Sequence, residues 1–314
     1  MRHPSRFAPR SHLHRRHHPG RKDYAFRHLI NTGMRCTKRT EAKIGLMLAS
    51  VCPLSCAFAT LMPRARLRQA SDACHAYEDR YDRPAASQID HQGLHVDQYG
   101  TVVDMQTGLV EAATPVLKAK NWPGNPNSFV TWWRRTHFEN STIDALLGKE
   151  HTLYREIGER AVAFVMDRAG ISHTPEEVHA LVAAIERLKP FSEVPTALDR
   201  LRTRYKLAVL SNGDHDMLET ARHYHGVAFD RIISVTLANA FKPHHRTYET
   251  AADLMGVVPE EVLFIANHAF DCIGAKATGM RAAFIDRRCR PFGATPHQPD
   301  LIVPNMTDLA DLIA

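Results

Sequence analysis

The chain has 314 residues, of which 44% are hydrophobic and 24% charged, as is ordinary for a soluble globular protein with one large core or two smaller ones. Its net charge of +6 is unevenly distributed: residues 1–83 carry 17 Lys or Arg and 6 Asp or Glu, whereas the remainder holds 23 basic and 28 acidic residues. The basic character therefore belongs to an N-terminal extension. This argues against nucleic-acid binding by the net acidic body, because tracking a phosphate backbone requires clustered Lys and Arg.

The N-terminal extension, residues 1–90, is rich in Arg and His, and we expect it to be disordered. From Met34 the sequence is typical of an export signal over residues 34–59: a basic stretch, an apolar stretch, and Ala57-Phe58-Ala59 as a small-x-small cleavage site. Pro53 interrupts the apolar stretch, which is also borderline for the about 20 apolar residues of a membrane span. We therefore expect no stable membrane span and a cytoplasmic protein, with export to the periplasm as the alternative.

The first element of the body is a short apolar strand, Leu94 to Val96, followed by Asp97-Gln98-Tyr99-Gly100-Thr101. Gly100 permits the sharp turn that follows the tip of a strand. Asp97 at that tip can act as a nucleophile if a positive charge holds its carboxylate ionised, although a structural turn residue is the alternative for Asp97 taken alone. Two residues after Asp97 the chain has Tyr99. An enzyme that expels an alkoxide from a phosphate ester would benefit from a carboxylic acid at this position, which could protonate the leaving oxygen. A leaving group such as a halide needs no such acid.

Residues 108–195 have the hydrophobic spacing and the capping residues of helices, and we find no strand signal among them. Thr174-Pro175-Glu176-Glu177, for example, combines a Thr cap, Pro at the first helical position and Glu three residues after the cap. The helices that we expect within or at the end of this stretch are Phe129–Leu147, His151–Ala169, Thr174–Leu188 and Ser192–Arg202.

The rest of the body alternates short apolar strands with helices, which is typical of a parallel sheet buried on both faces. We expect strands at Leu207–Leu210, Ile232–Val235, Val262–Ile265, Arg281–Ile285 and Leu301–Val303, and helices at Met217–Tyr224, Thr247–Met255 and Cys272–Thr278. The predicted fold class is therefore α/β. Residues 91–107 and 196–314 would form the sheet-based core, and residues 108–195 a helical insert after the first strand.

Four polar side chains follow the carboxyl ends of predicted strands: Asp97, Ser211, Lys242 and Asp271. In an open parallel sheet these ends share one edge, where ligands collect. Lys242 would lower the pKa of Asp97 and hold it charged. Ser211 and nearby backbone amides could bind an anionic substrate group, and Asp271 could orient water or Lys242, or bind a metal.

These blocks resemble the haloacid dehalogenase superfamily, and within it the type II L-2-haloacid dehalogenases. The resemblance is found in D-x-Y-G-T from Asp97 to Thr101, in Leu210-Ser211-Asn212-Gly213, in Lys242-Pro243 with Tyr248 six residues after the Lys, and in Phe264 to Asp271 with Gly274-Ala275 behind it. It covers about residues 93–290, and residues 108–195 match the family's helical cap in position and size. The resemblance implies a Rossmann-like parallel sheet core with the cap inserted after the first strand.

The resemblance also implies hydrolytic dehalogenation of small (S)-2-haloacids to (R)-2-hydroxyacids without metal or cofactor. Asp97 would form an ester with the halogen-bearing carbon, and water positioned with help from Asp271 would hydrolyse it. Arg134 matches the cap arginine that receives the halide. The other matched residues are Asn212 and Phe270 around the halide, and Thr101, Ser211, Lys242 and Tyr248 around Asp97 and the substrate carboxylate. The partners implied are a haloacid, a halide and a second copy of the chain in a homodimer.

Three residues depart from the family pattern. Ala266 stands where the dehalogenases usually have Ser, and His268 where they have Asn. His268 could replace the lost polar function near neutral pH, or it could be a structural histidine. Gln98, where a small or apolar residue is usual, would make the pocket more polar and favour a substrate other than a short haloacid.

Two other functions stay open from the sequence. One is a magnesium-dependent phosphatase that uses Asp97 and Asp271, against which Tyr99 argues. The other is a non-catalytic member of the fold that binds a carboxylate ligand or a partner. Ala266 favours this last interpretation, whereas the retained Asp97, Lys242 and Asp271 argue against it.

Overall fold

The computed structural model describes residues 92–226 and 228–314, and its framework is one parallel sheet of six strands. The strands are β1 (Gly93–Val96), β2 (Lys206–Ser211), β3 (Arg231–Ser234), β4 (Val262–Ala266), β5 (Arg281–Ile285) and β6 (Leu301–Val303). Their order across the sheet is β3-β2-β1-β4-β5-β6, so that β1 lies in the middle, with Leu94 opposite Leu207 on one side and Leu263 on the other. This confirms the predicted α/β class.

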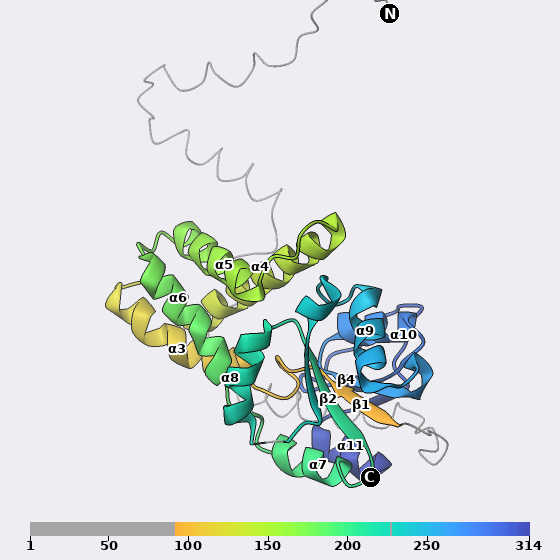
Figure 1. Ribbon diagram of the computed structural model, residues 1–314. Helices are drawn as coiled ribbons and strands as arrows, with labels where there is room; N and C mark the ends of the chain where they lie inside the picture. The colour runs from red at the N-terminus through yellow and green to blue at the C-terminus, as the bar shows by residue number, and fades with distance from the viewer. Residues whose placement is uncertain (1–91, 227) are drawn as a thin grey trace, which may run out of the picture. The chain divides into compact units, whose positions relative to one another are not determined.

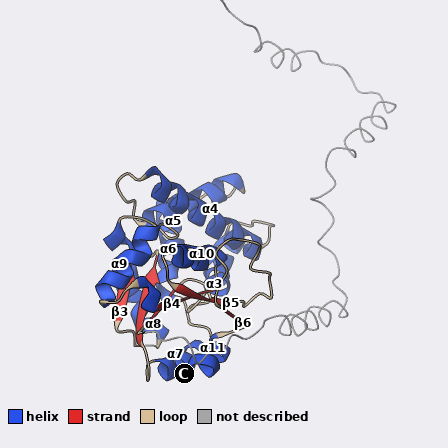
Figure 2. Ribbon diagram, turned by 90° about the vertical axis from the view of Figure 1, so that its right-hand side faces the viewer, coloured by secondary structure: helices blue, strands red, loops and turns tan. Residues whose placement is uncertain are grey.

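Helices cover both faces of the sheet, which explains why the strands are apolar runs rather than alternating ones. Figure 2 shows the strands in red enclosed between blue helices. The helices of the core are α7 (Val194–Leu201), α8 (His215–His225), α9 (His245–Met255), α10 (Ala269–Ala277) and α11 (Met306–Ile313), with the short 3₁₀ helices η3 (Val235–Ala238) and η4 (Pro259–Glu261). Each connection between two strands brings the chain back to the amino end of the next strand, so the carboxyl ends of all six strands lie at the same edge of the sheet.

The insert after β1 is a set of packed helices, which we call the cap: α3 (Met105–Ala119), α4 (Pro126–Leu147), α5 (Tyr154–Arg168), α6 (Pro175–Ala183) and the 3₁₀ helix η2 (Ala184–Arg187). In Figure 1 α4 and α5 run side by side in the cap. Helix α4 begins after Asn125, whose side chain accepts hydrogen bonds from the Asn127 and Ser128 amides, and ends at Gly148 with φ +60°. The Thr174–Glu177 capping box predicted from the sequence is present at the start of α6.

The boundaries of the cap differ by a few residues from those expected. Asp104 caps α3 by accepting from the Thr107 amide, so the insert begins at Met105 rather than 108. Helix α7 packs on α11 and so belongs with the core, which places the end of the cap before Val194 instead of at 195.

Two smaller expectations were wrong, and the C-terminal helix α11 was not predicted. Val235 does not end β3 but opens η3, because the Ser234 hydroxyl accepts from the Thr236 amide and turns the chain. The helix expected to continue to Leu188 changes from α6 to the tighter η2 at Ala184.

The N-terminal extension and the export signal predicted at 34–59 lie outside the described residues. Within the described part of the chain, no helix combines the length and the apolar character needed to cross a bilayer.

Candidate active site

Asp97 stands directly after β1, in the middle strand, and its carboxylate meets the ammonium group of Lys242. Lys242 Nζ lies 2.8 Å from Asp97 Oδ1 and also donates to the Leu210 carbonyl at 3.0 Å. Both side chains are almost fully buried. Burial alone would raise the pKa of the Asp97 carboxyl, but the charges and hydrogen bonds of Lys242 and His268 outweigh it and hold that pKa well below its ordinary value. Asp97 is therefore ionised at neutral pH, as a carboxylate nucleophile must be.

The second oxygen of Asp97 is held by the turn that follows it. Thr101 Oγ1 donates to Asp97 Oδ2 at 2.8 Å and accepts from the backbone amide of Asn267 at 2.9 Å. The turn after β1 is thereby joined to the loop after β4. Gly100 makes the turn with φ +90°, a conformation that a residue with a Cβ rarely adopts.

Asp271, in the first turn of α10, is the second acid of the site. Its Oδ2 lies 3.3 Å from Lys242 Nζ, and its Oδ1 accepts from the Tyr248 hydroxyl at 3.1 Å. Burial raises the pKa of Asp271 to about 6, because removal from water and the nearby Asp97 charge together outweigh the attraction of Lys242. The environment thus separates the two acids: Asp97 is held charged, whereas Asp271 can exchange a proton near neutral pH.

His268 completes the group around Asp97. Its Nδ1 lies 3.5 Å from Asp97 Oδ2, and its ring packs near Phe270 with 5.4 Å between the ring centres. A Cβ on Gly100 would lie 2.9 Å from His268 Cε1, so the imidazole fits directly over the turn. The histidine that replaces the family's usual Asn therefore lies beside the Asp97 carboxylate and not in the scaffold.

Asp97, His268 and Asp271 offer three atoms close enough together to hold a cation. Their donor set does not fit magnesium, which prefers an octahedron of oxygen ligands. Each of the four carboxylate oxygens already accepts a hydrogen bond from Lys242, Thr101 or Tyr248. The third ligand would be an imidazole nitrogen, which magnesium does not favour.

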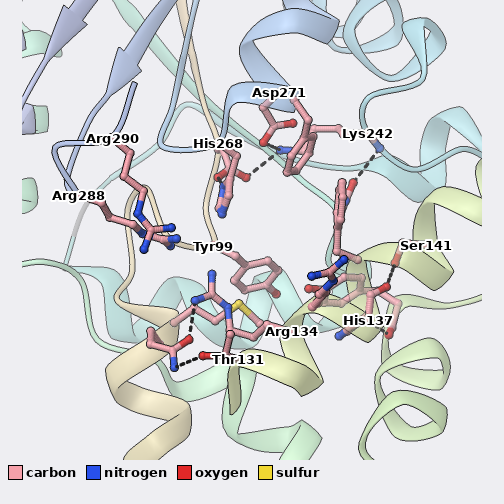
Figure 3. A pocket seen from close by; sticks show the side chains of 18 of the residues that line it. Tyr99, Thr131, Arg134, His137, Ser141, Lys242, His268, Asp271, Arg288 and Arg290 are labelled. Atoms are coloured by element: carbon pink, nitrogen blue, oxygen red, sulfur yellow. Dashed lines mark hydrogen bonds and ion pairs between the residues drawn. The ribbon is translucent and has the colours of Figure 1, made fainter. Parts of the chain in front are cut away.

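A cavity of about 550 Å³ opens in front of these groups, between the core and α4 of the cap. Figure 3 shows its side chains. Arg134 enters from α4 and donates to Gln106 Oε1 at 2.8 Å, and a Cβ on Gly100 would lie 3.7 Å from one of its guanidinium nitrogens. Phe138 of α4 meets Phe270 of α10 with ring centres 4.4 Å apart, which closes the cavity on one side. The cap thus brings the Arg134 cation and the Phe138 ring to the cavity that Asp97 also lines.

Seven of the ten predicted site residues line this cavity: Asp97, Arg134, Asn212, Lys242, His268, Phe270 and Asp271. The other three, Thr101, Ser211 and Tyr248, are fully buried and do not line it. Thr101 and Tyr248 each hold one of the two acids, as described above. Ser211 Oγ accepts from the Gly213 amide at 3.2 Å, so its predicted contact with a substrate group stays a prediction.

Gln98 does not make the pocket more polar, contrary to the expectation. Its side chain is buried behind the turn, outside the cavity lining, and finds no hydrogen-bond partner among the described residues. The reason is that Gln98 directly follows Asp97. Successive side chains of an extended backbone point in opposite directions, so that when Asp97 faces the cavity Gln98 faces away from it.

Several residues of the cavity were missed by sequence reasoning. Tyr154, at the start of α5, stacks on Tyr99 with ring centres 5.6 Å apart, and Gln106 holds Arg134. Arg288 and Arg290 follow the carboxyl end of β5 and also line the cavity. The rule that polar residues after parallel strands meet at one edge would have found these two arginines.

A buried carboxylate at the tip of the middle strand, held ionised by a lysine and facing a capped cavity, has the arrangement expected of an enzyme with a nucleophilic aspartate. The family model described as haloacid dehalogenase-like hydrolase matches residues 93–279, more than half of the chain. The chain belongs to that family.

Curated relatives and solved structures agree with this assignment. Haloacetate dehalogenase H-2 of Moraxella sp. (strain B) is 31% identical over 71% of this chain and 98% of its own length. The (S)-2-haloacid dehalogenase of Xanthobacter autotrophicus is 32% identical over 61% of this chain and 73% of its own length. The structure of L-2-haloacid dehalogenase from that organism with covalently bound chloropropionic acid superposes with a TM-score of 0.63 at 28% identity, covering 71% of this chain and 98% of the other.

Proposed function

We propose that the protein hydrolyses (S)-2-haloacids to (R)-2-hydroxyacids through an ester on Asp97. The observation that carries this proposal is the ionised Asp97 carboxylate, fixed by Lys242 at 2.8 Å and Thr101 at 2.8 Å, at the floor of a cavity that a cap arginine enters. The named activities of the relatives support the same reaction.

In the first half of the reaction, a carboxylate oxygen of Asp97 attacks the halogen-bearing carbon from the side opposite the halogen. The new C–O bond forms as the carbon–halogen bond breaks, so the configuration inverts and the halide leaves with the bonding electrons. Arg134 is a cation on the cap side of the cavity, and its guanidinium would stabilise the negative charge that develops on the halogen. Since a halide leaves without a proton, Tyr99 in place of an acid is no obstacle.

In the second half, water attacks the carbonyl carbon of the Asp97 ester. Asp271, with its pKa raised to about 6, can accept the proton of that water near neutral pH. Lys242 contacts both acids and would stabilise the oxyanion of the tetrahedral intermediate. The bond between the Asp97 carbonyl carbon and the substrate oxygen then breaks. The departing oxygen takes up the proton held by Asp271, and the acid left on Asp97 loses its remaining proton to solvent, which frees the hydroxyacid and restores both carboxylates.

His268 is placed to help with the water. It lies 3.5 Å from the Asp97 carboxylate and lines the cavity, on the side of Asp97 held by Thr101 rather than by Lys242. We infer that its imidazole orients the hydrolytic water and so takes over a polar function that Ala266 cannot supply.

The magnesium-dependent phosphatase is the second candidate, and the donor geometry described above disfavours it. A non-catalytic binding protein is disfavoured by the opposite pKa shifts of Asp97 and Asp271, which a binding role does not require. Homodimerisation and a cytoplasmic location stay predictions; light scattering of the purified protein and cell fractionation, respectively, would test them.

Chloride release from L-2-chloropropionate, with and without magnesium, tests the reaction class. Wild type should release chloride and form the D-hydroxyacid without added metal, and Asp97→Asn should release none. A phosphate ester hydrolysed only with magnesium, with all haloacids untouched, would instead support the phosphatase.

A single turnover in ¹⁸O-labelled water tests the covalent step. The oxygen of the first product should come unlabelled from Asp97, while the label enters the peptide that contains Asp97. Label in the first product would show direct attack by water and contradict the ester.

A further inference from the structure

The cavity holds more positive charge than the proposed reaction uses. Five cationic side chains line it, and the two carboxylates of its lining, Asp97 and Asp271, both contact Lys242. The other four cations are Arg134, Arg135, Arg288 and Arg290. Arg135 pairs with Glu139 on its own helix and Arg290 has an interaction of its own, so the uncompensated charge is that of Arg134 and Arg288.

Arg288 extends into this space from the loop after β5. Figure 3 shows Arg288 and Arg290 reaching from that loop toward the part of the cavity where His268 and Arg134 lie. Within residues 92–226 and 228–314, the Arg288 guanidinium makes no hydrogen bond or ion pair, and that of Arg134 is held by the neutral amide of Gln106 alone.

The charges of Asp286 and Asp104 act on Arg288, but within the described residues neither carboxylate forms an ion pair with its guanidinium group. Asp286 Oδ1 accepts from the backbone amides of Arg288 and Arg290, and Asp104 caps α3. Arg134 and Arg288 face each other as like charges, and burial together with this repulsion lowers the pKa of Arg134. An anion bound at Arg288 would relieve this repulsion and take the bidentate donors of the Arg288 guanidinium group.

The size of the cavity leaves room for such a group. At about 550 Å³ it falls within the range of pockets that enclose ligands much larger than a two- or three-carbon haloacid. In the proposed reaction the halide and the reacting carbon would occupy the region of Asp97 and Arg134, whereas Arg288 lies on a different element, in the loop after β5.

We propose that Arg288 binds a second anionic group of the substrate, so that the enzyme prefers 2-haloacids that carry another carboxylate or a phosphoryl group beyond the reacting carbon. This proposal rests on the proposed dehalogenase function and adds its substrate class.

The test compares one monoanionic acid, 2-chloropropionate, with two acids that have a further anionic group, 2-chlorosuccinate and 2-chloro-3-phosphonopropanoate. The full-length wild type is compared with Arg288→Gln. The control is Arg281→Gln, which removes the same charge from an exposed arginine at the opposite end of β5.

Wild type should favour at least one of the two larger acids over 2-chloropropionate by about tenfold or more in kcat/KM. The acid that is favoured shows whether the second anionic group is a carboxylate or a phosphoryl group. Arg288→Gln should lower kcat/KM for that acid about tenfold, through KM, as expected for the loss of one charge-assisted hydrogen-bonded pair. Turnover of 2-chloropropionate should change less than twofold. Arg281→Gln should change neither.

An equal loss for all three acids would overturn the proposal, since Arg288 would then serve the carboxylate that every substrate shares. So would a preference for 2-chloropropionate that Arg288→Gln leaves unaltered. If wild type releases no chloride from any acid, the proposed function fails. In that case the binding of (R)-malate and of (R)-lactate, measured by calorimetry, still tests the second anion site. Wild type should bind (R)-malate more tightly than (R)-lactate, and Arg288→Gln should bind the two with equal affinity.

Discussion

Lys242 Nζ lies 2.8 Å from Asp97 Oδ1 and 3.3 Å from Asp271 Oδ2, so that one buried cation is shared by two buried acids. Removal of one partner from such a group leaves charge without compensation in a medium of low polarity. The stability of the site and its chemistry therefore depend on the same side chain.

Lys242→Met keeps the length of the side chain but removes its charge. We expect a loss of about 3–5 kcal/mol in the free energy of unfolding, because Asp97 and Asp271 would remain buried without their cation. Halide release should fall by about 10²–10³-fold. Chemical denaturation and chloride release measure the two effects, and a variant that keeps wild-type turnover would remove Lys242 from the mechanism.

The hydrolytic half-reaction should depend on pH through Asp271. Burial raises the pKa of its carboxyl to about 6, and only the ionised form can accept a proton. Decay of the ester should therefore speed up as pH rises through about 6 and level off above it, while ester formation, which depends on Asp97 with its lowered pKa, stays constant there.

Quenched single-turnover measurements between pH 5 and pH 8 would separate the two steps. Asp271→Asn should lose the inflection along with most of the decay rate. A flat decay profile in the wild type would show that a different group handles the water.

The acids and the lysine could be predicted from sequence because each follows a short apolar strand, and a parallel sheet brings such positions to one edge. The halide-binding role expected of Arg134 came from the family resemblance, since helical periodicity does not say which helix of the cap faces the site. Tyr154 was missed because it meets Tyr99 only through the packing of the cap on the core, 55 residues away along the chain. Gln98 was misplaced because its polarity was considered without the direction of its side chain.

Arg134→Gln should reduce chloride release by about 10²-fold with little loss of stability. Arg134 contributes one hydrogen bond to Gln106 but lines the cavity where, in the proposed reaction, the halide would leave, so chemistry should suffer more than folding. Arg160→Gln, at an exposed cap arginine paired with Glu156 on the same helix, is the matched control and should keep full activity. Equal turnover in both variants would place the halide elsewhere.

His268→Ala should slow hydrolysis of the ester and leave its formation largely intact. The imidazole lies 3.5 Å from Asp97 Oδ2, where it can orient the water that attacks the ester carbonyl. Mass spectrometry of acid-quenched enzyme should then detect the Asp97 adduct during turnover. His268→Asn, which restores a hydrogen-bonding side chain, should recover part of the rate; a structural role would show as lost stability without an adduct.

Gly100→Ala tests whether the turn and the histidine act together. Gly100 has φ +90°, so alanine should cost about 1–3 kcal/mol in the free energy of unfolding through backbone strain. The new Cβ would also lie 2.9 Å from His268 Cε1 and push the imidazole from its place beside Asp97.

Gly148→Ala is the control. Gly148 also has a positive φ, +60°, but nothing lies within 4 Å of the methyl group that alanine would add. It follows the last residue of α4 and does not line the cavity. Denaturation should report a loss for both variants, whereas slow ester hydrolysis should appear in Gly100→Ala alone. If the two variants hydrolyse the ester equally fast, the close approach of His268 to the turn has no part in catalysis.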